Sequence, residues 1–95
     1  MSLNDYITAY LQARNEWKIF TDTHAIKSFG FTTIYETEDL TRHHNALLKE
    51  YERRFALLCS FFPSNYRTNI SAIDTDLIMG SISDDEFRKI MNALL

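Results

Sequence analysis

Residues that break helices are scarce in this sequence, which contains two glycines and one proline among 95 residues. Its single cysteine, Cys59, rules out an internal disulfide. No apolar run approaches the ~18 residues of a membrane-spanning helix, and the chain does not begin with a basic segment followed by an apolar one. These absences argue against a disulfide-stapled secreted scaffold, and they predict a cytoplasmic protein with no signal peptide and no membrane partner.

The excess of negative over positive charge is also small, because the chain has 13 acidic and 10 basic residues and a net charge of −3. This slight acidic excess disfavours nucleic acid as a partner. Aromatic residues make up 14% of the chain, and with so few helix breakers they indicate a compact, mostly helical protein. The length is enough for one domain with a real core, so we expect a single helical domain over residues 1–95.

The longest helical pattern predicts a second main helix over 38–62, capped by Thr37 and stopped by Pro63. Its apolar side chains follow one another at steps of three, four or seven residues: Leu40, Leu47, Tyr51, Phe55, Leu58 and Phe62. The last eight residues, 55–62, are almost entirely apolar. We therefore expect this helix to be central, with its final turns enclosed by the rest of the chain. On its solvated side, Glu50 precedes Arg54 by four residues, a spacing that favours an ion pair.

Three further helices follow from caps and spacing. Ser2 and Asp5 form the pattern of a capping box for a helix over 3–19. That helix carries a stripe of aromatic and small residues: Tyr6, Tyr10, Ala13, Trp17 and Phe20. Apolar spacing predicts a helix over 65–79 that Gly80 ends. A second capping box, Ser83 with Glu86, begins a helix over 84–94. The sequence thus predicts an all-α bundle of four main helices.

The segment between the first two helices is less regular. Thr23 is placed to cap a short helical turn near 24–29, with Gly30 at its end. The next residues are β-branched or aromatic, which favours an extended crossover, or a strand that pairs with the sheet edge of a partner. Four large apolar residues here lie outside any helical stripe, so they are either buried or mark a protein interface: Phe29, Phe31, Ile34 and Tyr35.

Sequence patterns of catalysis and ligand binding are missing. There is no nucleophile elbow, no glycine-rich phosphate loop, and no Cys-x-x-Cys or His-x-x-x-His spacing. We therefore predict no cofactor, no metal and no enzymatic activity. The leading hypothesis is a small regulatory protein that docks on another protein, as immunity proteins, antitoxins, phage inhibitors and assembly chaperones do. One alternative is a helical homodimer that buries the aromatic stripe of helix 3–19, and another is a small metal-dependent enzyme that uses His43 and His44.

Overall fold

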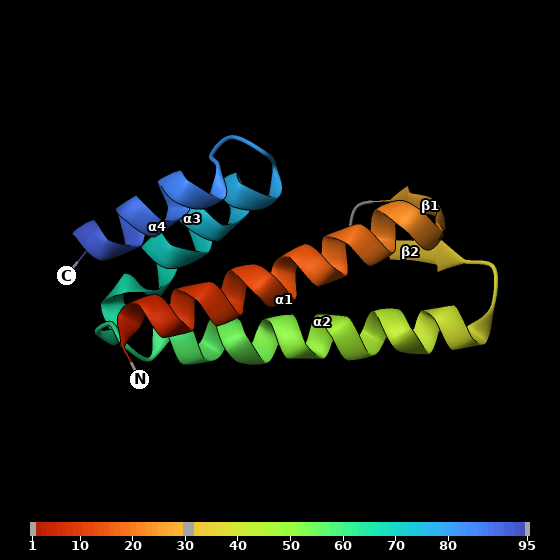
Figure 1. Cartoon of the computed structure of the whole chain (residues 1–95), viewed down its shortest axis with the longest axis horizontal. Coiled ribbons are helices and arrows are strands. Elements are labelled where there is room, and N and C mark those ends of the chain that lie inside the picture. Colours follow the sequence, from red (N-terminus) through yellow and green to blue (C-terminus); the bar gives the residue numbers. More distant parts are fainter. Residues whose placement is uncertain (1, 30–31, 95) are drawn as a thin grey trace.

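Two long antiparallel helices and a β-hairpin between them form the body of the fold (Figure 1). The computed structural model describes residues 2–29 and 32–94, with the backbone alone at positions 27–29, 32 and 33. In chain order the elements are α1 (Leu3–His24), β1 (Ala25–Phe29), β2 (Thr32–Tyr35), α2 (Glu38–Cys59), a 3₁₀ turn (Ser64–Tyr66), α3 (Arg67–Ile78) and α4 (Asp84–Ala93). The predicted all-α architecture of four main helices is confirmed.

Three of the four predicted helix starts are confirmed by their caps, whereas the helix predicted from 65 begins at Arg67, after the 3₁₀ turn, without a side-chain cap. Ser2 and Asp5 exchange both hydrogen bonds of a capping box, as Ser83 and Glu86 do at the start of α4. The hydroxyl of Thr37 accepts from the Leu40 amide at 3.2 Å. Each such cap typically stabilises a helix by about 1 kcal/mol.

The turn between α3 and α4 depends on Gly80, whose φ of 79° is the left-handed conformation that glycine tolerates best. The Ser81 amide donates to the Asp76 carbonyl at 2.9 Å, and the Gly80 amide donates to the Leu77 carbonyl at 3.2 Å. These two bonds form a Schellman motif, which satisfies the last carbonyls of α3. The chain can therefore turn sharply into α4.

The short helical turn predicted near 24–29 is wrong, because His24 ends α1 and residues 25–29 form strand β1. Thr23 does not cap a new helix; it lies inside α1, where its hydroxyl donates to the Ile19 carbonyl at 2.7 Å. β1 pairs antiparallel with β2, with Ser28 opposite Thr33, and the register shifts between Ala25 and Lys27. The extended segment expected after position 31 therefore has a partner strand within the chain, and Gly30 and Phe31 lie outside the described residues.

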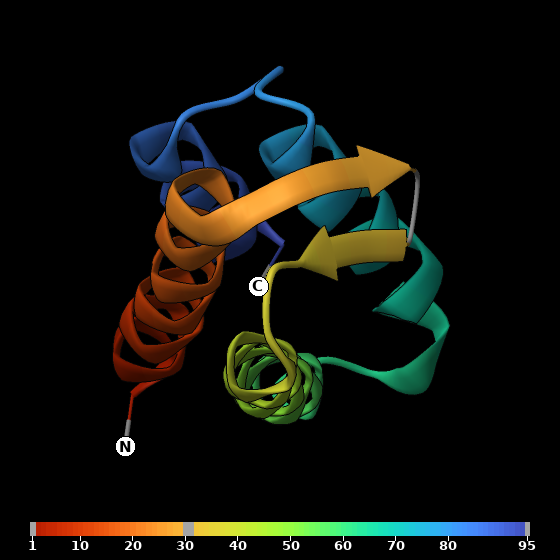
Figure 2. The ribbon, with the colours of Figure 1, turned by 90° about the vertical axis from the view of Figure 1, so that its right-hand side faces the viewer.

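The end of α2 is not enclosed as predicted. Leu58 is fully buried, but Ala56, Leu57 and Ser60 are exposed. Figure 2 shows the reason: α3 and α4 lie together on one side of the α1–α2 pair, so they cover one face of it. The molecule is elongated, with extents of 43 × 26 × 22 Å. α1, which contacts α2, α4 and β1, shares the centre of the fold with α2.

Tyr10 is the residue through which the four helices meet. It is fully buried, and its ring centroid lies 5.6 Å from that of Tyr51 on α2 and 5.1 Å from that of Phe87 on α4. Its hydroxyl donates to Asp74 on α3. Aliphatic side chains fill the space around it: Leu3, Ile7, Leu11, Leu58, Ile70, Leu77 and Met91. This core lies between the first half of α1, the second half of α2 and the C-terminal helices.

A neighbouring pair of leucines tests this placement of the core. Leu58→Ala should lower the free energy of unfolding by about 2–5 kcal/mol, because it leaves a cavity at a fully buried site. Leu57→Ala, at a site that is 38% exposed, should cost less than about 1 kcal/mol. Urea denaturation followed by circular dichroism measures both losses. Equal losses would contradict the one-sided covering of α2.

Candidate functional site

A charged residue occupies a buried position of α1. Ile7, Tyr10, Arg14 and Trp17 follow one another at steps of three, four and three residues, so they share one face of the helix. That face packs inward, and Arg14 is 5% exposed. The fold therefore holds a guanidinium group in its interior, where an unpaired charge carries a large desolvation cost.

Asp74, a half-buried carboxylate on α3, accepts hydrogen bonds from two tyrosines. The hydroxyl of Tyr51 donates to both Asp74 oxygens at 2.6 and 2.7 Å, and the hydroxyl of Tyr10 donates to one of them. Burial raises the pKa of Asp74 to about 6 and that of Tyr51 to about 12. The cluster ties α1, α2 and α3 together without forming an ion pair with Arg14.

The guanidinium of Arg14 is only partly satisfied. Its Nη2 donates to the Leu77 carbonyl at 2.8 Å, where the negative end of the α3 dipole offsets part of its charge. Its Nε is enclosed and has no hydrogen-bonding partner. No carboxylate of the described residues lies within ion-pairing distance of it. Buried polar groups without partners are rare in native proteins, so this one requires an explanation.

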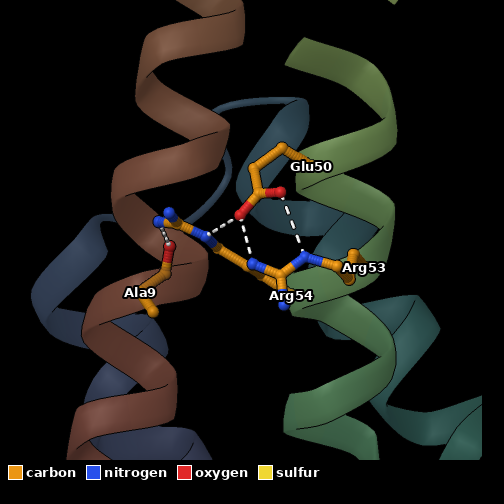
Figure 3. Close-up of polar contacts among 4 residues, drawn as sticks. All are labelled: Ala9, Glu50, Arg53 and Arg54. Atoms are coloured by element: carbon orange, nitrogen blue, oxygen red, sulfur yellow. Dashed lines mark hydrogen bonds and ion pairs between the residues drawn. The ribbon is translucent and has the colours of Figure 1, made fainter. Parts of the chain in front are cut away.

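Arg54 shows how the same chain satisfies an arginine (Figure 3). Its Nε donates to Glu50 at 2.7 Å, and its Nη1 crosses to the Ala9 carbonyl of α1 at 2.8 Å. Hydrogen bonds from Arg53 and Arg54 lower the pKa of Glu50 to about 2. The predicted Glu50–Arg54 pair is thus confirmed. In the groove of about 310 Å³ beside it, both arginines have Glu50 as an ion-pair partner, so neither guanidinium is unpaired.

Arg14, in contrast, helps to form the wall of a pocket of about 210 Å³. The lining residues come from α1 and the end of α3: Arg14, Trp17, Lys18, Thr21, Asp22 and Ile78. Two of these side chains are cationic and one is acidic, and none of the three forms an ion pair within the described part of the chain. With a hydroxyl from Thr21 and apolar walls from Trp17 and Ile78, the pocket fits a small group that is anionic at one end.

Exposed apolar side chains are found at the end of α3 and on the hairpin. Ile78 belongs to the wall of the Arg14 pocket, and the adjacent Met79 is 75% exposed. On the hairpin, Ile26 is 65% exposed and Ile34 is exposed as well. Figures 1 and 2 show that the hairpin and the α3–α4 pair lie on the same side of the α1–α2 pair, apart from each other along its length. The pocket lies on the part of α1 between them.

The four predicted interface residues have different positions. Ile34 is exposed, whereas Tyr35 is buried and its hydroxyl lies 2.5 Å from Nδ1 of His44. Thr21, a pocket residue, lies 3.4 Å from the same hydroxyl, so Tyr35 joins the hairpin to the pocket wall. Phe29 belongs to β1, but its side chain is outside the described part of the structure, and Phe31 lies outside it altogether.

The histidines do not converge. His44 is half-buried between Tyr35 and Trp17, and burial lowers its pKa. His43 is exposed and its ring packs on Phe20, with the centroids 4.5 Å apart. Over residues 2–29 and 32–94, no three His, Cys, Asp or Glu side chains are grouped to hold a metal ion. Cys59 is buried, and burial raises the pKa of its thiol, which disfavours the reactive thiolate.

In comparisons with known proteins, no family, no curated protein and no solved structure matches this chain. Within the described ranges, no helix has both the length and the apolar character that crossing a membrane requires. The candidate site therefore depends on its geometry alone.

Arg14 was missed as a site residue because the predicted stripe of this helix was assigned to its neighbour Ala13. The available signal was the heptad-like spacing of Ile7, Tyr10, Arg14 and Trp17, which places a charge on an otherwise apolar stripe. The pocket itself needs Ile78, a residue 64 positions further along the chain. No local pattern predicts that contact.

The Asp74 cluster gives a pH-dependent prediction. The folded state holds a proton on Asp74 up to about pH 6, whereas an unfolded chain holds it only below its ordinary pKa near 3.8. The contribution of this group to stability is therefore fully present below about pH 3.8 and is lost as the pH rises through 6. Asp74→Asn keeps the shape and one oxygen acceptor but cannot titrate.

The measurement is the free energy of unfolding of both proteins in urea at several pH values between 4 and 7. Relative to Asp74→Asn, the wild type should lose stability as the pH rises across this range. Asp76→Asn, at an exposed carboxylate of the same helix, is the matched control and should follow the wild type. A constant difference between the wild type and Asp74→Asn would contradict the burial of this carboxyl group.

Proposed function

We propose that this chain is a small cytoplasmic protein that regulates another protein by docking on it. The docking face, as defined here, consists of the Arg14 pocket and the exposed apolar side chains on the hairpin and at the end of α3: Ile26, Ile34, Ile78 and Met79. This proposal keeps the type of function that the sequence favours and assigns it to a particular side of the molecule.

The observation that carries the proposal is the position of Arg14. A buried guanidinium without an acid partner lowers stability unless something outside the chain engages it. It lies at the wall of a pocket whose other wall, Ile78, continues into the exposed Met79. Protein interfaces combine these features, with arginine and methionine enriched in their centres and an anchor held in a pocket.

The hairpin supports the same face. Each of its strands has one neighbour in the sheet, so among the described residues both outer edges present unpaired backbone groups. A two-stranded hairpin is marginally stable alone and usually packs on other elements. An extended segment of a partner can pair with such an edge, and the alternative from the sequence, a strand here that pairs with the sheet edge of a partner, uses the same kind of contact.

The homodimer alternative has less support, because the surface predicted to mediate it is internal. Tyr10 is fully buried, and the Trp17 ring packs on Tyr51 with centroids 5.5 Å apart. Phe20 is also buried, against Tyr35 and His43. The aromatic stripe of α1 therefore serves the core, and we propose that the partner is a different protein.

A pair of serine variants tests the docking face. Ile78→Ser combined with Met79→Ser removes the apolar wall beside the Arg14 pocket, and it should lower capture of the partner from cells of the native host at least tenfold. Quantitative mass spectrometry of proteins that co-purify with the tagged chain measures this loss. The tag belongs at an end remote from the face under test.

Leu57→Ser is the matched control, because Leu57 is exposed to nearly the same degree as Ile78, 38% against 41%, but lies on α2 beside the Arg53–Arg54 groove. It should capture the partner as the wild type does. Circular dichroism must show all three proteins folded. Equal capture by the double variant and the control would contradict the docking face, and no captured protein with the wild type would contradict docking altogether.

A further inference from the structure

We propose that the Arg14 pocket binds a carboxylate group carried on a short apolar stem, and that this group is an acidic side chain of the partner. The binding of a carboxylate is inferred from the pocket itself. Only its source in a partner rests on the function proposed above.

The donors in the pocket define the charge of the ligand. Nη2 of Arg14 donates to the Leu77 carbonyl, Nε is enclosed without an acceptor, and Nη1 forms no hydrogen bond with a described residue. Lys18 supplies a second cation, and Thr21 supplies a hydroxyl. Charge-assisted hydrogen bonds from such groups to a carboxylate are about twice as strong as neutral ones. An anion therefore supplies the partner that the buried guanidinium lacks.

The remaining walls distinguish a carboxylate from a more highly charged anion. Asp22 also lines the pocket, so two cations face one acid and the net charge is a single positive. A phosphate dianion would be repelled by Asp22 and would leave part of its charge unpaired. Trp17 and Ile78 give the pocket apolar sides, which suit the methylene groups of a glutamate or aspartate side chain.

The size and surroundings of the pocket favour a side chain of a protein over a free metabolite. At about 210 Å³ it is smaller than the pockets of about 300–1,000 Å³ that hold typical small-molecule ligands. Its rim is formed in part by Ile78, followed by the exposed Met79, and a bound protein would remove both from water. On the partner, an acidic side chain would fill the pocket, and an apolar residue beside it would cover this rim.

The first arm of the test uses a small probe in place of the partner. Isovalerate carries a carboxylate on a branched apolar stem, and isovaleramide is its neutral analogue of the same shape. In a titration of the ¹⁵N-labelled protein, isovalerate should give saturable shifts of the Lys18 and Thr21 amides and the Arg14 Nε–H. A Kd on the order of 1–50 mM is expected for a ligand of this size.

Two controls make this arm decisive. Arg14→Met should remain folded and lose isovalerate binding at least tenfold, whereas Arg67→Met, at an exposed arginine, should bind as the wild type does. No saturable shift with isovalerate, an equal response to isovaleramide, or unchanged binding by Arg14→Met would each overturn the carboxylate site. A micromolar Kd for free isovalerate would overturn the assignment of the carboxylate to a partner, because it would indicate a small-molecule site.

The second arm tests the source of the carboxylate. With the captured partner bound, isovalerate at several times its own Kd should displace the partner from the wild type, and isovaleramide should not. A partner that stays bound would overturn the acidic anchor and leave docking intact. Failure to capture any partner would overturn the proposed function, while the first arm would still decide whether the pocket binds a carboxylate.

Discussion

The register of α1 against α3 is the constraint on which the rest of the structure depends. Tyr10 and Arg14 are four residues apart on α1, and Asp74 and Leu77 are three residues apart on α3, so each pair lies on one face of its helix. The hydrogen bond from Tyr10 to Asp74 sets the register, and that register brings Arg14 under the Leu77 carbonyl. The stabilising contact between Tyr10 and Asp74 therefore places the unpaired charge of Arg14 beside Leu77.

Each half of α1 has a different task because of this register. Up to Tyr10 the helix packs on α2 and α4, the Tyr10 hydroxyl contacts Asp74 on α3, and the core lies there. Beyond Trp17 it is covered by α2 and the hairpin, and one of its sides is open over the pocket. Proteins commonly hold strained or unsatisfied groups where they bind other molecules, and they offset the cost with packing elsewhere. The Tyr10 core is that packing here.

Local signals in the sequence were enough to predict that four helices exist and where three of them begin, because caps act over three or four residues. The ends predicted at 19 and 62 differ from the observed ends at His24 and Cys59. Ser2 with Asp5, Ser83 with Glu86, and Gly80 all act as predicted. The hairpin could not be predicted in the same way. In the sequence, Thr23 resembles the cap of a new helix. Strand β1 forms instead, because its backbone pairs with β2, and the residues near Thr23 do not indicate that pairing.

The enclosure of α2 and the Arg14 pocket could not be predicted for a related reason. An apolar helix end indicates that burial is favourable, but it does not tell which sides the other helices reach. The two capping boxes determine where α1 and α4 begin, not how they pack. Likewise, the spacing of Arg14 shows that it shares a stripe with Tyr10 and Trp17. That it has no carboxylate partner depends on which residues α3 places beside it, and the spacing does not predict these. Of the predicted interface residues, Ile34 is exposed and Tyr35 is buried, a difference that follows from strand alternation once the hairpin is known.

The most direct measurement is the free energy of unfolding of Arg14→Met, obtained by urea denaturation. Methionine fills similar space without the charge, and the Leu77 carbonyl keeps its hydrogen bond from the Gly80 amide. If Arg14 is retained for binding and not for stability, the variant should be as stable as the wild type or up to about 3 kcal/mol more stable. A loss of about 2 kcal/mol or more would show that Arg14 serves the fold, and it would contradict the role of the pocket.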